Sequence, residues 1–171
     1  MQRGVVAHRL LQSLPNISPE RQRTSAEAYL ARAAKDFTPD ERARILDQTL
    51  ALINDARFAV LFGPGSRGEV PIVGRLACRT GVLAVTGQVD RLTVTESEVW
   101  IADFKTNRPP PRRIAEVPPA YVRQLSIYRA VLAQIYPGRT VRCALIWTEV
   151  PDLMELPADE LDRKLDAIIS S

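Results

Sequence analysis

The sequence predicts an α/β domain with a mixed central sheet flanked by helices. Up to about residue 56, apolar residues recur at the spacing of amphipathic helices. The chain then changes to short runs rich in Val, Ile, Leu and Thr, which are typical of strands, and it closes with a helix, a strand and a helix. No linker divides the 171 residues. We therefore expect one domain, with an N-terminal helical part (residues 1–56) and an α/β core (residues 57–171).

The N-terminal part is predicted to be helical because each apolar stripe has clear end signals. Pro15 ends the first helix, and Ser18 precedes a proline as a plausible N-cap of the second. Thr38 and Glu41 have the spacing of a capping box at the start of the third. The predicted helices are residues 4–14, 18–36 and 38–55.

The core is predicted to alternate strands with two further helices. Glycine and proline clusters mark the turns between the runs, and a proline-rich loop covers residues 108–119. The predicted strands are residues 58–62, 69–78, 81–95, 98–106 and 140–150. The predicted helices are residues 120–138 and 157–171. This order is three or four strands, then helix, strand and helix.

The composition, with 46% hydrophobic and 25% charged residues, is that of a globular protein. No apolar run approaches the ~20 residues of a membrane helix, and the N-terminus lacks the features of a signal peptide, so we expect no membrane contact and a cytoplasmic location. The net charge of +3 permits a polyanionic partner without requiring one. Cys78 and Cys143 lie far apart, which predicts neither a disulfide nor an iron–sulfur cluster.

Two aspartates are predicted to face each other across a hairpin. If the strands on either side of Glu96-Ser97 pair symmetrically, the numbers of all opposed residues add up to 193, as those of Asp90 and Asp103 do. Opposed residues have Cβ atoms about 4.5–5.5 Å apart, and like charges at that distance are destabilising. A divalent cation would compensate, since Mg²⁺ takes oxygen ligands from one or two carboxylates.

Lys105 follows Asp103 at a spacing that puts both side chains on one face of the strand. An ammonium group there can touch a phosphate and stabilise developing negative charge. The simpler alternative is a salt-bridged strand end, with Asp103 paired to Lys105 or Arg91 and Asp90 an ordinary acid. A lone Asp-x-Lys favours that alternative, and the opposed Asp90 reduces its weight.

The loop that follows carries a local concentration of arginines at Arg108, Arg112 and Arg113. We predict that they contact the phosphate backbone of a nucleic acid. An ordinary solvated loop explains the cluster equally well on composition alone.

Several motifs in order resemble the PD-(D/E)XK nucleases. The series is "GQVDRL", "IADFKTNRPPP" and "YVRQLSIY", and "RGVVAHRLLQSLP" resembles the opening helix of the RecB-type nuclease domain, which bears one histidine. The segments "FGPGSRGEVPI", "DFKTNRPPP" and "CALIWTEVPDLMELP" are similar to the C-terminal nuclease domain of alphaproteobacterial AddA helicase–nucleases. The resemblance covers essentially the whole chain and implies a restriction-endonuclease-like core with extra N-terminal helices.

The resemblance implies a site for Mg²⁺, or for Mn²⁺ in its place. His8, Asp90, Asp103 and the backbone carbonyl of Phe104 match the metal ligands, and Lys105 matches the catalytic lysine. For His8, the only histidine, a surface position on an amphipathic helix would otherwise be the favoured interpretation.

Three further residues match the family. Gln124 and Tyr128 match its Q-x-x-x-Y helix, and their spacing puts both on one helical face, where they could bind DNA or brace the site. A polar residue beside a core tyrosine is an equally good interpretation from the spacing alone. Glu69 matches the acid on the first core strand, although an exposed strand acid is common.

The implied function is metal-dependent hydrolysis of DNA, as an exonuclease acting on single-stranded ends in recombinational repair of double-strand breaks. In that context a helicase motor lies upstream or in trans, and an AddB-type subunit is the partner. This chain itself has no G-x-x-x-x-G-K-[ST] nucleotide site. Two alternatives remain open: a catalytically silent module that binds or scaffolds DNA ends, and a stand-alone exonuclease of phage or mobile-element origin.

Overall fold

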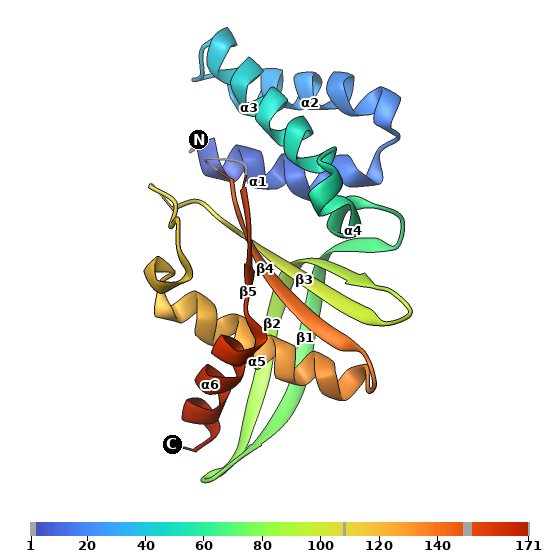
Figure 1. The fold of residues 1–171 in the computed structure, drawn as a ribbon. Helices are drawn as coiled ribbons and strands as arrows, with labels where there is room; N and C mark the ends of the chain where they lie inside the picture. The colour runs from blue at the N-terminus through green and yellow to red at the C-terminus, as the bar shows by residue number, and fades with distance from the viewer. Residues whose placement is uncertain (1–2, 108, 149–151, 171) are drawn as a thin grey trace.

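The structure is a computed structural model that describes residues 3–107, 109–148 and 152–170. Its centre is a five-stranded sheet in the order β1-β2-β3-β4-β5 (Figure 1). Strands β3 and β4 run parallel and the other neighbours run antiparallel, so the predicted mixed sheet is confirmed. The strands are β1 (Ser66–Cys78), β2 (Gly81–Val94), β3 (Glu98–Lys105), β4 (Thr140–Trp147) and β5 (Asp152–Leu156).

Helices flank the sheet, as the sequence predicts. The N-terminal helices gather at one end of the molecule, and α5 and α6 pack together at the other end (Figure 1). Helix α5 makes the crossover that joins the parallel strands β3 and β4. The helices are α1 (Arg3–Ser13), α2 (Pro19–Ala33), α3 (Pro39–Ile53), α4 (Ala59–Phe62), α5 (Pro119–Ile135) and α6 (Ala158–Ile169).

The sheet separates two apolar cores, and β3 contributes to both. Trp100, Ala102 and Phe104 pack in the core that the N-terminal helices cover. Val99 and Ile101 pack in the opposite core, under α5. Alternate residues of a strand point to opposite faces, so a strand in the middle of a covered sheet is apolar on both sides. Any charged residue on β3 is therefore expected to have a specific partner.

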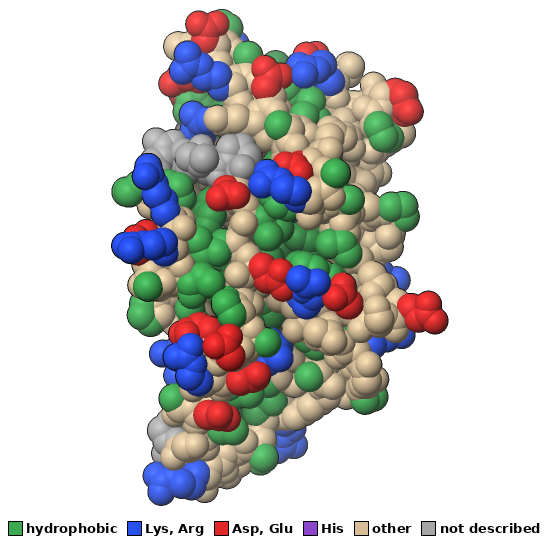
Figure 2. Space-filling view, in the orientation of Figure 1, with side chains coloured by type: hydrophobic (Ala, Val, Ile, Leu, Met, Phe, Trp, Pro, Cys, Tyr) green, Lys and Arg blue, Asp and Glu red, His purple; other side chains and the backbone are tan. Residues whose placement is uncertain are grey.

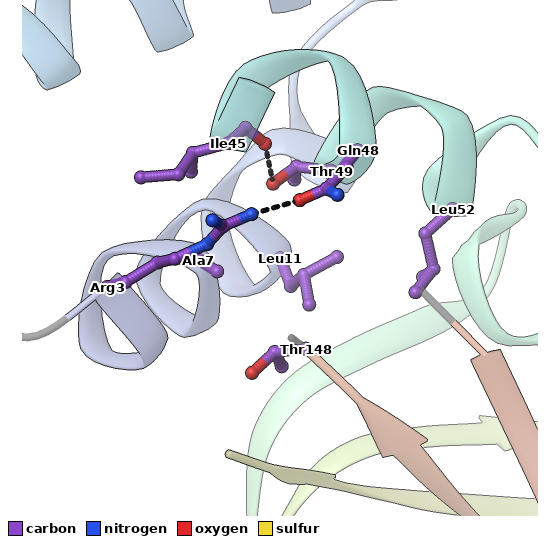
Figure 3. A pocket seen from close by; sticks show the side chains of 8 residues that line it. All are labelled: Arg3, Ala7, Leu11, Ile45, Gln48, Thr49, Leu52 and Thr148. Atoms are coloured by element: carbon purple, nitrogen blue, oxygen red, sulfur yellow. Dashed lines mark hydrogen bonds between the residues drawn. The ribbon is translucent and has the colours of Figure 1, made fainter. Parts of the chain in front are cut away.

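The N-terminal helices begin where the sequence predicts. Thr38 and Glu41 form the predicted capping box at the start of α3, with the Glu41 amide donating to Thr38 Oγ1 at 3.2 Å. Ser18 occupies the N-cap position of α2, but its side chain makes no capping hydrogen bond. Helix α1 packs against α3 around a pocket of only about 10 Å³, where Arg3 donates to Gln48 (Figure 3). That volume is at the limit for one water molecule, so this pocket cannot hold a substrate.

One predicted element is wrong, and one strand of the sheet has no counterpart in the prediction. Residues 58–62 form the end of a 3-10 turn and the short helix α4 instead of a strand, because a short apolar run has no periodicity that distinguishes the two. The sequence gives no clear strand signal at β5, because its five residues, Asp-Leu-Met-Glu-Leu, do not alternate between polar and apolar. The predicted strand 140–150 ends at Trp147, and its last two residues lie outside the described part of the chain.

The visible surface carries charges of both signs. On the face shown in Figure 2, basic and acidic side chains are interspersed, without a patch of one sign. Among the described residues, no helix is long and apolar enough to cross a membrane.

Candidate active site

The hairpin has the predicted register, and the site lies where its pairing ends. Residues 91–94 of β2 pair with residues 99–102 of β3, each pair of numbers adding up to the predicted value. The last ladder pair is Arg91 with Ala102. Asp90 and Asp103 are the next pair in this register, but no backbone pair is formed between them. The two strands thus separate at the two carboxylates.

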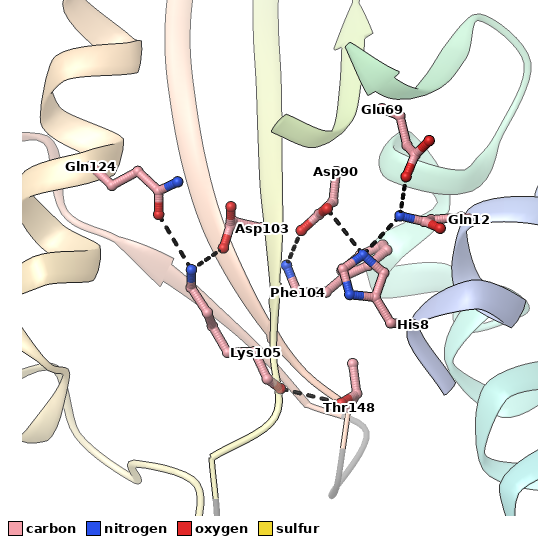
Figure 4. A network of polar contacts seen from close by, with 9 residues as sticks. All are labelled: His8, Gln12, Glu69, Asp90, Asp103, Phe104, Lys105, Gln124 and Thr148. Carbon is pink, nitrogen blue, oxygen red and sulfur yellow. Dashed lines mark hydrogen bonds and ion pairs between the residues drawn. The ribbon is translucent and has the colours of Figure 1, made fainter. Parts of the chain in front are cut away.

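Asp90 uses its carboxylate to replace the missing ladder contact. Its Oδ2 accepts the backbone N–H of Phe104 at 2.7 Å, and its Oδ1 lies 3.0 Å from His8 Nε2 (Figure 4). The Phe104 ring packs edge-on against the His8 imidazole, with centroids 5.2 Å apart. Because Phe104 points into the core under α1, it fixes the position of the histidine that α1 carries. The structure therefore brings His8, Asp90 and Phe104 together; Phe104 takes part through its N–H and its ring, whereas the resemblance implies a role for its carbonyl, which stays a prediction.

A contact that the sequence did not predict continues from His8 to β1. Gln12, one helical turn after His8, has its amide nitrogen 2.8 Å from His8 Nε2 and 2.6 Å from Glu69 Oε1. Glu69 has a backbone φ of 53°, in the left-handed region that residues other than glycine seldom adopt. The kink at Glu69 lies beside the point where β2 leaves β3, and it directs the carboxylate to Gln12.

Asp103 and Lys105 form a buried ion pair on the opposite side of β3. Only 7% of the Asp103 side chain and 14% of the Lys105 side chain are exposed. Burial raises the pKa of Asp103 above its ordinary value, and the Lys105 ammonium partly opposes that rise. Lys105 Nζ also donates to Gln124 Oε1 at 3.3 Å and lies 4.0 Å from the centroid of the Tyr121 ring. The salt-bridged alternative is thus correct about the contact between Asp103 and Lys105.

The Q-x-x-x-Y pair braces this lysine from α5. Gln124 Nε2 donates to Tyr128 Oη at 3.4 Å, and Tyr128 is buried against the backbone of Gly87. A side chain at Gly87 would fall within 1.8 Å of the Tyr128 hydroxyl, so glycine is required there for close approach. On the other side, the Thr148 N–H donates to the Lys105 carbonyl at 2.9 Å.

Together these residues form two groups of polar contacts between α1 and α5, one around His8 and Asp90 and one around Asp103 and Lys105, drawn in Figure 4. We call the two groups together the polar row; it consists of Glu69, Gln12, His8, Asp90, Asp103, Lys105 and Gln124. The predicted residues on β1, β2, β3, α1 and α5 all contribute to it or pack against it.

The predicted arginine cluster stays apart from the row. Arg113 pairs with Glu116 of the same loop at 2.7 Å, and the Arg112 backbone N–H donates to the same carboxylate. Among the described residues, neither side chain contacts the polar row. Arg108 lies outside the described residues. Their role in binding nucleic acid stays a prediction.

Arg91 is an unusual neighbour of the row. Its side chain is fully buried, and its three guanidinium nitrogens have no hydrogen-bond partner among the described residues. The guanidinium carbon of Arg91 lies 5.5 Å from the centroid of the Phe62 ring, over the ring face. Burial lowers the pKa of Arg91 to about 10, which leaves it charged at neutral pH. The interior next to Asp90 therefore holds a positive charge whose electrostatic effect water does not screen.

A scan against protein-family models matches residues 1–167 to the PD-(D/E)XK nuclease superfamily. The chain belongs to the PD-(D/E)XK nuclease superfamily. Two solved structures align loosely with it. SSO0001 is 17% identical, with a TM-score of 0.37, and the alignment covers 84% of this chain and 69% of SSO0001. Protein VC1899 from Vibrio cholerae is 14% identical, with a TM-score of 0.36, and the alignment covers 98% of this chain and 47% of VC1899. No curated protein matches significantly.

Membership of the PD-(D/E)XK superfamily implies a nuclease, and nucleases of this kind typically use divalent metals. Among the residues that the structure describes, no group of three or more His, Cys, Asp or Glu side chains is arranged as a preformed metal site. The donor chemistry nevertheless fits a divalent cation. His8 and Asp90 are in contact at 3.0 Å where β2 and β3 separate, and the charges of both act on the pKa of the buried Asp103, so one imidazole and two carboxylates are near enough to influence one another.

His8 Nε2 has two polar neighbours. The amide nitrogen of Gln12 lies 2.8 Å away and Asp90 Oδ1 lies 3.0 Å away. An imidazole nitrogen carries either one proton or one lone pair, so Nε2 donates to Asp90 in one tautomer and accepts from Gln12 in the other. In either tautomer the contacts hold the imidazole beside Asp90.

Gln12 and Thr148 are the members of the site that sequence reasoning missed. Gln12 lies four residues after His8, the spacing at which two helical side chains share a face, so the signal was present once His8 was singled out. Thr148 gave no signal, because its contact with Lys105 depends on the parallel pairing of β3 and β4.

Proposed function

We propose that the chain is a divalent-metal-dependent deoxyribonuclease that hydrolyses the phosphodiester backbone at the polar row. The observation that carries the proposal is the contact of His8 with Asp90, near the buried Asp103–Lys105 pair and at the point where β2 and β3 separate. Superfamily membership over residues 1–167 supports the class of reaction. We further propose that the chain works as one nuclease unit, since His8 comes from the helical part and the other groups from the α/β core.

His8, Asp90 and Asp103 would hold the metal, Mg²⁺ or Mn²⁺, together with the carbonyl of Phe104. When bound, the cation would polarise the phosphate and lower the pKa of a water molecule. Gln12 lies 2.8 Å from His8 Nε2 and helps to hold the imidazole beside Asp90. Phe104 fixes the position of the imidazole through ring packing.

Lys105 would stabilise the negative charge that develops on the phosphate. Its ammonium is held by Asp103, by Gln124 and by the Tyr121 ring, so it does not have to be ordered at the moment of reaction. Gln124 and Tyr128 act here by positioning Lys105. Glu69 orients Gln12 in the same way.

The decisive experiment is the digestion of fluorescent single-stranded DNA with Mg²⁺ by the wild type, by Asp103→Ala and by the control Asp166→Asn, an exposed acid on α6. We expect Asp103→Ala to lose on the order of 10²-fold or more in rate, the control to keep its rate, and EDTA to stop the wild type. Equal rates for wild type and Asp103→Ala would refute the proposal. Undiminished DNA binding without any cleavage by the wild type would favour a catalytically silent module.

The biological setting is a finer part of the proposal. We propose an exonuclease domain of an AddA/RecB-type helicase–nuclease that degrades single-stranded DNA ends in double-strand break repair, in the cytoplasm. A helicase motor would lie upstream in the same protein or on a separate chain, and an AddB-type subunit would be the partner. The sequence motifs that resemble the AddA nuclease domain support this setting. A circular single strand, which has no end, should resist cutting, and an AddB-type subunit mixed with the motor should co-elute with this chain in size-exclusion chromatography. Cutting of the circle would instead indicate an endonuclease.

A further inference from the structure

Each end of the polar row opens into a pocket. The first pocket, of about 440 Å³, lies between α1, α2 and β1, and its lining includes Gln12 and Glu69 from one end of the row. The second, of about 310 Å³, lies between β2 and α5, and its lining includes Gln124 from the other end. We call them the α1 pocket and the α5 pocket. The proposed reaction centre lies between them (Figure 4).

The chemistry of both pockets suits a nucleotide. Their volumes lie at the lower end of the range for small-ligand sites, about 300–1,000 Å³. The α1 pocket is lined by Arg9, Asn16 and the aromatic ring of Tyr29, together with the polar end of the row. The α5 pocket combines Arg123 with apolar side chains, among them Ile127. A cation for a phosphate beside apolar or aromatic surface for a base is the usual composition of a single-strand binding groove.

The two arginines are free to bind an anion. Arg9 and Arg123 are exposed, and neither makes an ion pair with any residue that the structure describes. Many other exposed arginines are paired, as Arg113 is with Glu116. The fully buried guanidinium of Arg91 adds to the positive potential at the α1 pocket, because its Nη1 lies 3.4 Å from where a side chain of Gly68, a lining residue, would begin.

The depth of the reaction centre favours a single strand over a duplex. The Asp103 and Lys105 side chains are only 7% and 14% exposed, so the scissile phosphate has to enter the gap between β2 and β3. A duplex holds its phosphates on the outside of a stiff helix. A single strand can bend its backbone inward and turn the flanking bases into separate pockets.

We propose that one nucleic-acid strand crosses the polar row and places the nucleotides on either side of the scissile phosphate in the α1 and α5 pockets, with Arg9 and Arg123 on its phosphates. This inference rests on the proposed nuclease function and adds the path of the substrate to it. Neither arginine belongs to the proposed catalytic machinery.

The test is equilibrium binding of a fluorescein-labelled oligothymidylate, followed by anisotropy in EDTA so that no strand is cut. The variants are Arg9→Ala, Arg123→Ala and their combination, and Arg44→Ala on α3 is the matched control that removes one exposed arginine lining neither pocket. We expect each pocket variant to weaken binding several-fold and to reduce the slope of log affinity against log salt by about 0.7, the value for one phosphate contact with a single strand. The double variant should lose about twice that slope.

The outcomes separate this inference from the proposed function. Cleavage of DNA by the wild type, with unchanged binding by both arginine variants, would overturn the path and leave the nuclease assignment standing. A blunt duplex of equal length that binds as tightly, with the same dependence on Arg9 and Arg123, would overturn the preference for a single strand. Absence of cleavage by the wild type, with the arginine effects as expected, would overturn the nuclease function and keep the path.

Discussion

Substitution of Gly87 by alanine should disturb the site through packing alone. A Cβ atom there would lie 1.8 Å from Tyr128 Oη and 2.5 Å from its Cζ, far inside van der Waals contact. Gly87 lies in β2 and has no positive φ, so its backbone accepts alanine. The clash can be relieved only by moving the Tyr128 ring, which is 8% exposed and packs in the core under α5.

The expected loss of stability is best measured by comparing alanine at Gly87 with alanine at Gly68, a glycine on the neighbouring strand β1. Forcing an extra carbon into a packed core costs about 1–3 kcal/mol, whereas Gly→Ala at a tolerant site gains about 0.4–1 kcal/mol by restricting the unfolded chain. Gly68→Ala meets its nearest atom at 3.4 Å, so it should show mainly the gain. The two variants should therefore differ in free energy of unfolding by about 1–3 kcal/mol.

Urea unfolding at 25 °C measures both variants and a double-mutant cycle with Tyr128→Ala. Removal of the ring creates the space that the new methyl group needs, so Gly87→Ala should cost little in the Tyr128→Ala background. The coupling should be about 1–3 kcal/mol in favour of the double variant. Additive effects, or equal stabilities of Gly87→Ala and Gly68→Ala, would show that Tyr128 does not pack on Gly87 and would refute the reasoning.

Four further outcomes can be measured. Lys105→Met should lower the cleavage rate by about 10²–10³-fold while the dissociation constant for DNA in EDTA changes much less. Mg²⁺ should raise the melting temperature of the wild type but not of Asp90→Asn, because a ligand of the folded state stabilises it by mass action. Burial raises the pKa of Asp103, so the stability that this group contributes is present below its unfolded pKa and is lost as the pH rises through its folded pKa. Because Mg²⁺ has to displace the proton of Asp103, calorimetry should show that the affinity for Mg²⁺ falls as the pH is lowered. Arg91→Met should raise the urea midpoint, since unpaired buried polar groups cost about 1–3 kcal/mol each.

The hairpin shows what could be predicted from the sequence. The turn at Glu96-Ser97 fixes the register, and the register fixes which residues of β2 and β3 are opposed. The Thr38–Glu41 cap could be predicted for the same reason, since both partners are close in the chain. The side-chain direction of Asp90 could not, because it depends on the end of the ladder and on His8, which comes from a helix 82 residues earlier.

The errors have a common physical origin in tertiary context. Residues 58–62 are apolar and short, so their conformation is decided by the core they enter and not by their own pattern. Gln12 has no chemical signature until His8 is placed beside it. The pairing of Arg113 with Glu116 is local and could have been weighed from the sequence, because their spacing of three residues brings opposite charges together.

The position of the polar row follows from the alternation of β3. Asp103 and Lys105 point to the α5 face, while Phe104 points to the α1 face and packs against His8. Groups from opposite faces of a sheet can meet only where the sheet is interrupted. The ladder between β2 and β3 ends at Arg91, and the Asp90 carboxylate takes the N–H of Phe104 that a continued ladder would have used. The break in the sheet is therefore what would let the histidine of the N-terminal helices and the lysine of the core act on one phosphate in the proposed reaction.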